Sequence, residues 1–165
     1  MGIQIHDENK IRDLPEEQRF KICEHIIKND SDESKRWDAV WLIGEMAENK
    51  KDGESMYDKI ADIMGWVIEN DDNGVVKHEA CFQIAARNMR TKIPVLVNAS
   101  LNDSSNLTKH EALESLGLMR AFETEDLIRK ARNDSSKDVR ETAEFILKRF
   151  DRMRNQGDYK PGNIH

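Results

Sequence analysis

The sequence contains few of the residues that build tight turns and β-rich folds. Among 165 residues there are 3 prolines and 8 glycines, and aromatic residues make up 6%. Sandwiches and barrels need many turns and aromatic strands, so this composition argues against both. Hydrophobic residues account for 38% of the chain and charged residues for 35%. That balance is typical of a slender helical protein with a large surface, and we expect an all-α fold.

The sequence also lacks net positive charge and long apolar runs, and it has only two cysteines. The formal charge of -6 would repel a phosphate backbone, so a nucleic-acid partner is not expected. Cys23 and Cys81 lie far apart in the sequence, which indicates reduced core thiols in a cytosolic protein. No stretch approaches the ~20 apolar residues of a membrane span, and the N-terminus has no secretion pattern. We therefore expect a cytoplasmic location without membrane attachment.

Apolar residues recur at helical spacing along the whole chain. A first helix opens at Leu14-Pro15, and a second follows the capping cluster 31–34 and runs up to the turn at 49–53. Six further helices are predicted at 54–69, 75–89, 94–101, 107–119, 125–132 and 138–154. Together they predict four helix pairs in a single domain, 1–154, followed by a polar disordered tail, 155–165.

The second helix of each pair begins with a similar four-residue motif. The motifs are Arg36-Trp37-Asp38-Ala39, Lys77-His78-Glu79-Ala80, Lys109-His110-Glu111-Ala112 and Val139-Arg140-Glu141-Thr142. One short helix pair cannot bury its apolar stripe alone, so a repeated pair predicts stacking into a continuous core. The sequence resembles HEAT repeats of the short, phycobilisome-lyase-like type. The predicted architecture is an α-solenoid of about four HEAT-like pairs.

Two of these motifs carry residues that could bind a metal. His78-Glu79 and His110-Glu111 occupy the same position in consecutive repeats. Equivalent residues on stacked helices lie roughly 8–10 Å apart, a gap that two imidazoles can span through one ion. Two imidazoles and one carboxylate on one face of a metal ion, with open coordination positions on the other face, suit non-haem Fe(II). The competing interpretation is a solvated helix start, where a glutamate favours the helix dipole.

Four segments narrow the resemblance to the deoxyhypusine hydroxylase family. They are 76–81, 92–97, 108–117 and 138–144, and the similarity extends over about 34–154. That family is a tandem of two HEAT halves that face each other across a di-iron centre. The centre activates oxygen and hydroxylates a modified lysine on a translation initiation factor. This chain resembles one half of the tandem.

The resemblance implies roles for particular residues. His78, His110 and Glu111 would ligate one iron, and Glu79 would ligate it as well or lie beside it as the catalytic, substrate-contacting carboxylate. Glu114 lies four residues after His110 and is a second extra carboxylate, although a solvated position suits it better. With one motif pair per chain, a di-iron site needs a homodimer, and a monomer holds at most one iron.

A different class of function fits the same sequence. A solenoid without metal would act as a non-catalytic scaffold that holds a protein partner, as many repeat proteins do. Trp37, Trp41 and Trp66 are expected in the core rather than in a ligand platform. Iron content separates the two hypotheses.

Overall fold

The computed structural model describes residues 7–154, and this part of the chain is all-α, as expected. Short 3₁₀ turns precede α6 and lie on either side of α8. The helices are α1 (Glu8–Arg12), α2 (Glu16–Asn29), α3 (Glu33–Glu45), α4 (Ser55–Asn70), α5 (Gly74–Ala86), α6 (Ile93–Asn102), α7 (Asn106–Leu118), α8 (Glu125–Lys130) and α9 (Lys137–Met153).

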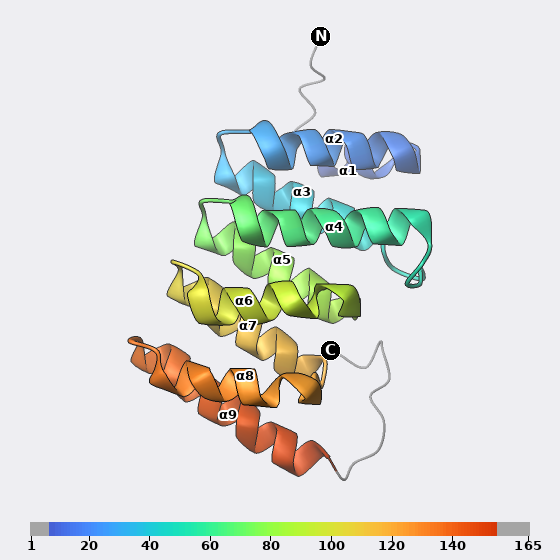
Figure 1. The fold of residues 1–165 in the computed structure, drawn as a ribbon. Helices are drawn as coiled ribbons and strands as arrows, with labels where there is room; N and C mark the ends of the chain where they lie inside the picture. Colours follow the sequence, from blue (N-terminus) through green and yellow to red (C-terminus); the bar gives the residue numbers. More distant parts are fainter. Residues whose placement is uncertain (1–6, 155–165) are drawn as a thin grey trace.

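Helices α2 to α9 form the four expected pairs. The pairs α2/α3, α4/α5, α6/α7 and α8/α9 stack in chain order, with α2, α4, α6 and α8 in one layer and α3, α5, α7 and α9 in the other (Figure 1). The α-solenoid prediction is thereby confirmed. Helix α1, which was not predicted, packs at the end of the stack beside α2 and α3.

The turn inside each pair is built from the same hydrogen bonds. An aspartate at the turn accepts the backbone N–H two residues further on, at 2.8–2.9 Å, in Asp30, Asp71, Asp103 and Asp134. The residue two positions further on then caps the second helix with its own side chain, as Asp32, Asn73, Ser105 and Ser136. Such side chains satisfy backbone donors at a helix start, so these short motifs fix where each second helix begins.

In the first three pairs, the basic side chain four residues after the cap reaches the turn aspartate of the following pair. The ion pairs are Arg36–Asp71 at 2.9 Å, Lys77–Asp103 at 2.8 Å and Lys109–Asp134 at 2.7 Å. These ion pairs tie each second helix to the turn of the next pair, one residue before Trp37, His78 or His110.

The caps correct the alignment of the fourth motif. Ser136 caps α9 as Ser105 caps α7, so Arg140 corresponds to Lys109 and Thr142 corresponds to Glu111. The expected alignment, which matched Val139 to Lys109, was wrong by one residue. It compared residue types inside the helix, whereas the cap sets the true helical register.

Several helix ends also differ from the prediction. Helix α3 ends at Glu45 rather than near 49, α5 ends at Ala86 rather than 89, and α8 gives way to 3₁₀ geometry after Lys130. Asn49, Asn88 and Arg120 lie in the connections after α3, α5 and α7 with φ of 66°, 51° and 50°. A left-handed residue cannot continue an α-helix, and asparagine tolerates this conformation well.

Buried apolar side chains from all the stacked pairs form a continuous core. Cys23 and Cys81 are buried and free, as expected for core thiols. Trp37 and Trp41 are only half-buried and stack at 6.1 Å between ring centroids on α3, so the core expectation holds for them only in part. Trp66 is also half-buried and packs against the core.

Across residues 7–154, no helix has the length and apolar character needed to cross a bilayer. The tail predicted at 155–165 lies outside the described residues.

Candidate metal centre

The two His-Glu motifs lie at the starts of neighbouring second helices. His78 and Glu79 belong to α5, and His110 and Glu111 belong to α7, at the fifth and sixth positions after the caps Asn73 and Ser105. Helices α5 and α7 pack against each other in the second layer. The repeated turn therefore places a histidine and a glutamate at equivalent positions in two adjacent repeats.

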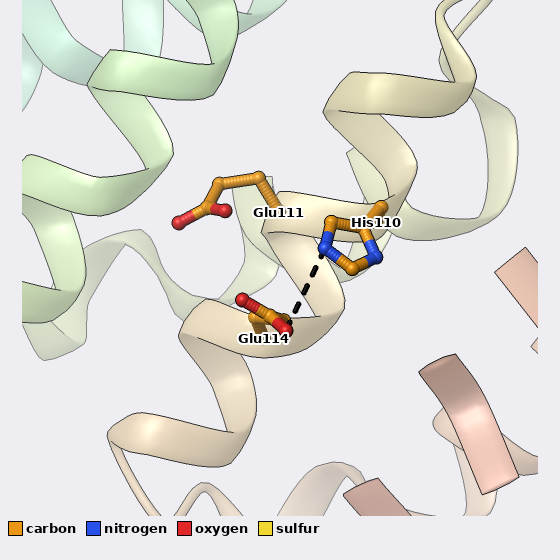
Figure 2. A group of neighbouring side chains, drawn as sticks. All are labelled: His110, Glu111 and Glu114. Carbon is orange, nitrogen blue, oxygen red and sulfur yellow. Dashed lines mark ion pairs between the residues drawn. The ribbon is translucent and has the colours of Figure 1, made fainter. Parts of the chain in front are cut away.

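Three side chains of α7 gather their ligand atoms in one place. One atom each from His110, Glu111 and Glu114 lies within 4.8 Å of the other two. In Figure 2, Glu114 lies below the His110 ring, whereas Glu111 extends towards α5. The side chain of Glu111 is 8% exposed, and those of His110 and Glu114 are 38% and 43% exposed. The group therefore has a buried side and an open side.

His78 joins this group through Glu111. Its Nε2 lies 3.0 Å from Oε2 of Glu111, across the boundary between α5 and α7. The hydrogen bond to Glu111 raises the pKa of His78; burial opposes the rise, and the negative charges of Glu111, Glu79 and Glu114 add to it. The glutamates around His78 thus favour the protonated form of its ring.

His110 has a contact at each ring nitrogen. Its Nε2 lies 3.5 Å from Oε1 of Glu114, one helical turn further on. Its Nδ1 lies 2.7 Å from the hydroxyl Oγ1 of Thr142, which belongs to α9 in the next repeat. The imidazole is therefore held between its own helix and the following one.

Glu79 occupies a different environment from Glu111, although the two are equivalent in the repeat. The residue is 6% exposed, and its Oε1 accepts a hydrogen bond of 2.9 Å from Nε2 of Gln83. Burial raises the pKa of Glu79, while the bond from Gln83 opposes the rise. Its oxygens are not part of the group formed by His110, Glu111 and Glu114.

An open groove of about 740 Å³ runs beside His110 between α7 and α9. It is lined by Asn106, Leu107, His110, Glu114, Asp138, Glu141, Thr142 and Phe145. Leu107 and Phe145 are 43% and 54% exposed, so the groove combines apolar walls with carboxylates. A ligand in this groove would reach the open side of the His110 group.

The donor chemistry of the group fits a borderline divalent ion. Imidazole nitrogen together with carboxylate oxygen suits iron, zinc or manganese, whereas sulfur-rich sites select other metals. Metal bonds of about 2.1 Å at right angles place two donors about 3 Å apart. His78 Nε2 lies 3.0 Å from Glu111 Oε2, which is the length of their hydrogen bond, and His78 is not among the three residues whose ligand atoms lie within 4.8 Å of one another.

Glu111 thus links His78 to the group that contains His110, whereas Glu79 is buried against Gln83 and is not part of that group. Glu114 is 43% exposed, in line with the expected solvated position, and it also lies 3.5 Å from His110 Nε2. Thr142 was not anticipated. The available signal was its register, because it corresponds to Glu111 once the fourth repeat is aligned by its cap Ser136.

Comparison with known proteins agrees with the repeat architecture. The HEAT-repeat family pattern matches residues 61–148, which is more than half of the chain. The chain belongs to the HEAT-repeat family. The match covers α5, α7 and most of α9, and so includes every residue of the His-Glu network.

Within the HEAT-repeat family, this chain is similar to deoxyhypusine hydroxylases, as its motifs indicated. It is 34% identical to the enzyme of Arabidopsis thaliana over 88 residues, covering 52% of this chain and 28% of that protein. It is 30% identical to the enzyme of Gallus gallus over 95 residues, covering 56% of this chain and 31% of that protein. The matched segments therefore span less than a third of these relatives.

A solved structure of human deoxyhypusine hydroxylase has the same fold. The two superpose with a TM-score of 0.72 at 19% identity, over 91% of this chain and 49% of the human chain. Nearly all of this HEAT domain therefore corresponds to about half of that structure.

Proposed function

We propose that this protein is an iron-binding, deoxyhypusine hydroxylase-like HEAT protein that hydroxylates a modified lysine on a protein substrate. The observation that carries the proposal is the group of ligand atoms from His110, Glu111 and Glu114 within 4.8 Å, to which Glu111 joins His78. The similarity to deoxyhypusine hydroxylases supports it.

His110, Glu111 and Glu114 would hold the ion, with His78 as a fourth ligand from the neighbouring repeat. Ferrous iron bound there would supply oxygen activation, the chemistry that an unactivated C–H bond requires. The buried Glu111 fixes one side of the site, and the groove leaves the other side open. Glu79 would lie beside the site as a buried carboxyl group held by Gln83.

The groove supplies binding properties suited to a cationic side chain. Asp138 and Glu141 line it together with Glu114, so three carboxylates face the same space. Phe145 and Leu107 add apolar surface for the methylene groups of a long amine. A lysine bearing an extended amine, as on a modified translation initiation factor, combines both properties.

A second copy of this chain would supply the other half of a di-iron centre. The fold corresponds to 49% of the human enzyme chain, and one copy carries one His-Glu motif pair. Two copies related by a two-fold axis would bring two such sites face to face. We therefore expect the iron-loaded protein to form a homodimer, and its solution mass with and without iron measures this directly.

Anaerobic loading with ferrous iron tests the metal site. Wild-type protein should retain about one iron per chain after desalting, and His110→Ala or Glu111→Gln should abolish retention. His25→Ala is the matched control, because His25 is an exposed histidine on α2 that contacts only Asn29 within its helix among the described residues. Iron retained equally by His110→Ala would contradict the site, and a metal-free wild type would contradict the enzymatic proposal.

Oxygen activation needs a separate measurement. Exposure of the iron-loaded protein to oxygen should produce a new optical absorption, and a peptide bearing the modified lysine should gain one oxygen atom by mass spectrometry.

The second candidate function is a scaffold for a protein partner, and the absence of a new absorption would leave this candidate. The exposed Phe145 and Leu107 in the groove favour that candidate, because they offer apolar docking surface without any metal.

A further inference from the structure

Thr142 contacts the ring nitrogen of His110 that lies away from Glu114. The Nδ1 to Oγ1 distance is 2.7 Å, shorter than the 3.5 Å from Nε2 to Glu114. Thr142 belongs to α9 and is 8% exposed, so this hydroxyl is shielded while the His110 ring edge stays accessible. The contact therefore joins a candidate ligand to the fourth repeat, which contributes no residue of its own to the group of ligand atoms.

The direction of this hydrogen bond follows from the partners of the threonine. Thr142 Oγ1 donates to the backbone carbonyl of Asp138, four residues earlier in α9, at 2.9 Å. A hydroxyl has one proton, and it is already used in this bond. The contact with His110 therefore requires Nδ1–H to donate and Thr142 Oγ1 to accept. A neutral His110 then has its lone pair on Nε2, towards Glu114.

An equivalent pair of residues is in contact one repeat earlier, between α5 and α7. His78 of α5 contacts Glu111, and His110 of α7 contacts Thr142, which has the equivalent position in the next helix. Glu111 meets Nε2 of His78, whereas Thr142 meets Nδ1 of His110. The threonine places a neutral acceptor where the preceding repeat has a charged one, and this leaves Nε2 of His110 free of a short contact.

We propose that Thr142 is a positioning residue that fixes the tautomer and the ring orientation of His110, so that Nε2 is presented as the metal-binding nitrogen. This inference rests on the proposed metal site. Histidine ligands commonly donate their second N–H to a carbonyl, carboxylate or water, and loss of that partner lowers metal affinity about 10- to 100-fold. Here the partner is a hydroxyl that relays the bond to a backbone carbonyl.

Two substitutions separate the hydrogen bond from the shape of the side chain. Thr142→Val keeps the branched shape but removes the hydroxyl, and Thr142→Ser keeps the hydroxyl. Thr108→Val is the matched control, because Thr108 lies in α7, is fully buried, and its hydroxyl has no hydrogen-bond partner among residues 7–154. All three variants should retain the helical circular dichroism of wild type.

The first readout is the ring ¹⁵N spectrum of His110 in the full-length metal-free protein, at a pH where the ring is neutral. Wild type, Thr142→Ser and Thr108→Val should show a protonated Nδ1 and an unprotonated Nε2, and Thr142→Val should lose this preference. The second readout is ferrous iron affinity under anaerobic conditions. Thr142→Val should bind iron about 10- to 100-fold more weakly, and Thr142→Ser should restore most of the affinity.

The two proposals fail in different ways. If wild type binds no iron, the metal site is wrong, and the ¹⁵N spectra still decide whether Thr142 sets the tautomer. If wild type binds iron and Thr142→Val binds it equally well, the inference about Thr142 is overturned while the metal site stands. A protonated Nε2 in neutral wild type would overturn it as well, because the threonine would then be the donor.

Discussion

Substitutions in the Lys77–Asp103 ion pair would test whether buried charge pairs hold neighbouring repeats together beside the His-Glu motifs. Lys77 Nζ lies 2.8 Å from Oδ1 and 3.0 Å from Oδ2 of Asp103, and the two side chains are 7% and 9% exposed. Removal of one partner of a buried pair costs about 3–5 kcal/mol, because the remaining charge is left without compensation. Since both groups keep slight contact with water, we expect about 3 kcal/mol for Lys77→Met.

The double variant isolates the interaction between the two charges. Asp103 Oδ1 also accepts the backbone N–H of Ser105, a bond that asparagine can keep, so Asp103→Asn removes the charge without removing the turn. Lys77→Met together with Asp103→Asn leaves no buried charge. We expect the double variant to lose no more stability than the worse single variant, which corresponds to a coupling of about 2 kcal/mol or more.

Urea unfolding followed by helical circular dichroism measures all four proteins of this cycle. Lys137→Met is the control, because the Lys137–Glu141 pair is 3.6 Å long and its side chains are 78% and 64% exposed, so no measurable change is expected. Losses that simply add in the double variant, with coupling below about 0.5 kcal/mol, would refute the reasoning. The pair would then behave as a surface ion pair that does not lock neighbouring repeats together.

Three further predictions concern the site and the core. The raised pKa of His78 means that its stabilising effect is complete below the ordinary histidine pKa of about 6.5 and is lost as the pH rises through the raised value. In the metal-free protein, Glu111→Gln should flatten that pH dependence of unfolding. A Cβ at Gly117 would lie 2.5 Å from Cδ1 of Ile146, so the end of that side chain must move in Gly117→Ala; alanine also favours the helix, so the net loss in urea unfolding should not exceed about 1 kcal/mol, and Ile146→Val, which lacks that atom, should recover it. Burial raises the pKa of Cys81 well above its ordinary value, so iodoacetamide at neutral pH should modify this thiol only as fast as the protein unfolds, and fast labelling of native protein would contradict its burial.

Much of the fold followed from local patterns. Apolar spacing located the helices after residue 14, and capping residues such as Asp32 marked their starts, because both signals arise within a few residues of the chain. The repeat of basic residue, histidine, glutamate and alanine predicted the stacked pairs for the same reason. Helix ends were placed less well. At Asn88 the chain leaves the helix through a left-handed residue that the apolar pattern does not register.

The sequence by itself showed that His78 and His110 hold equivalent positions, each followed by a glutamate, and so predicted a metal site at these two motifs. It could not determine how Glu79 and Glu111 differ, because the two occupy the same place in the repeat. Part of the difference is local, because Glu79 accepts a hydrogen bond from Gln83 one turn later in α5, and part comes from packing between repeats, where Glu111 meets His78. The role of Thr142 also depends on tertiary structure, since its contact with His110 joins residues 32 positions apart on different helices. A helix sets the direction of a side chain and supplies partners one turn away, but a partner on another helix is decided by the packing between repeats.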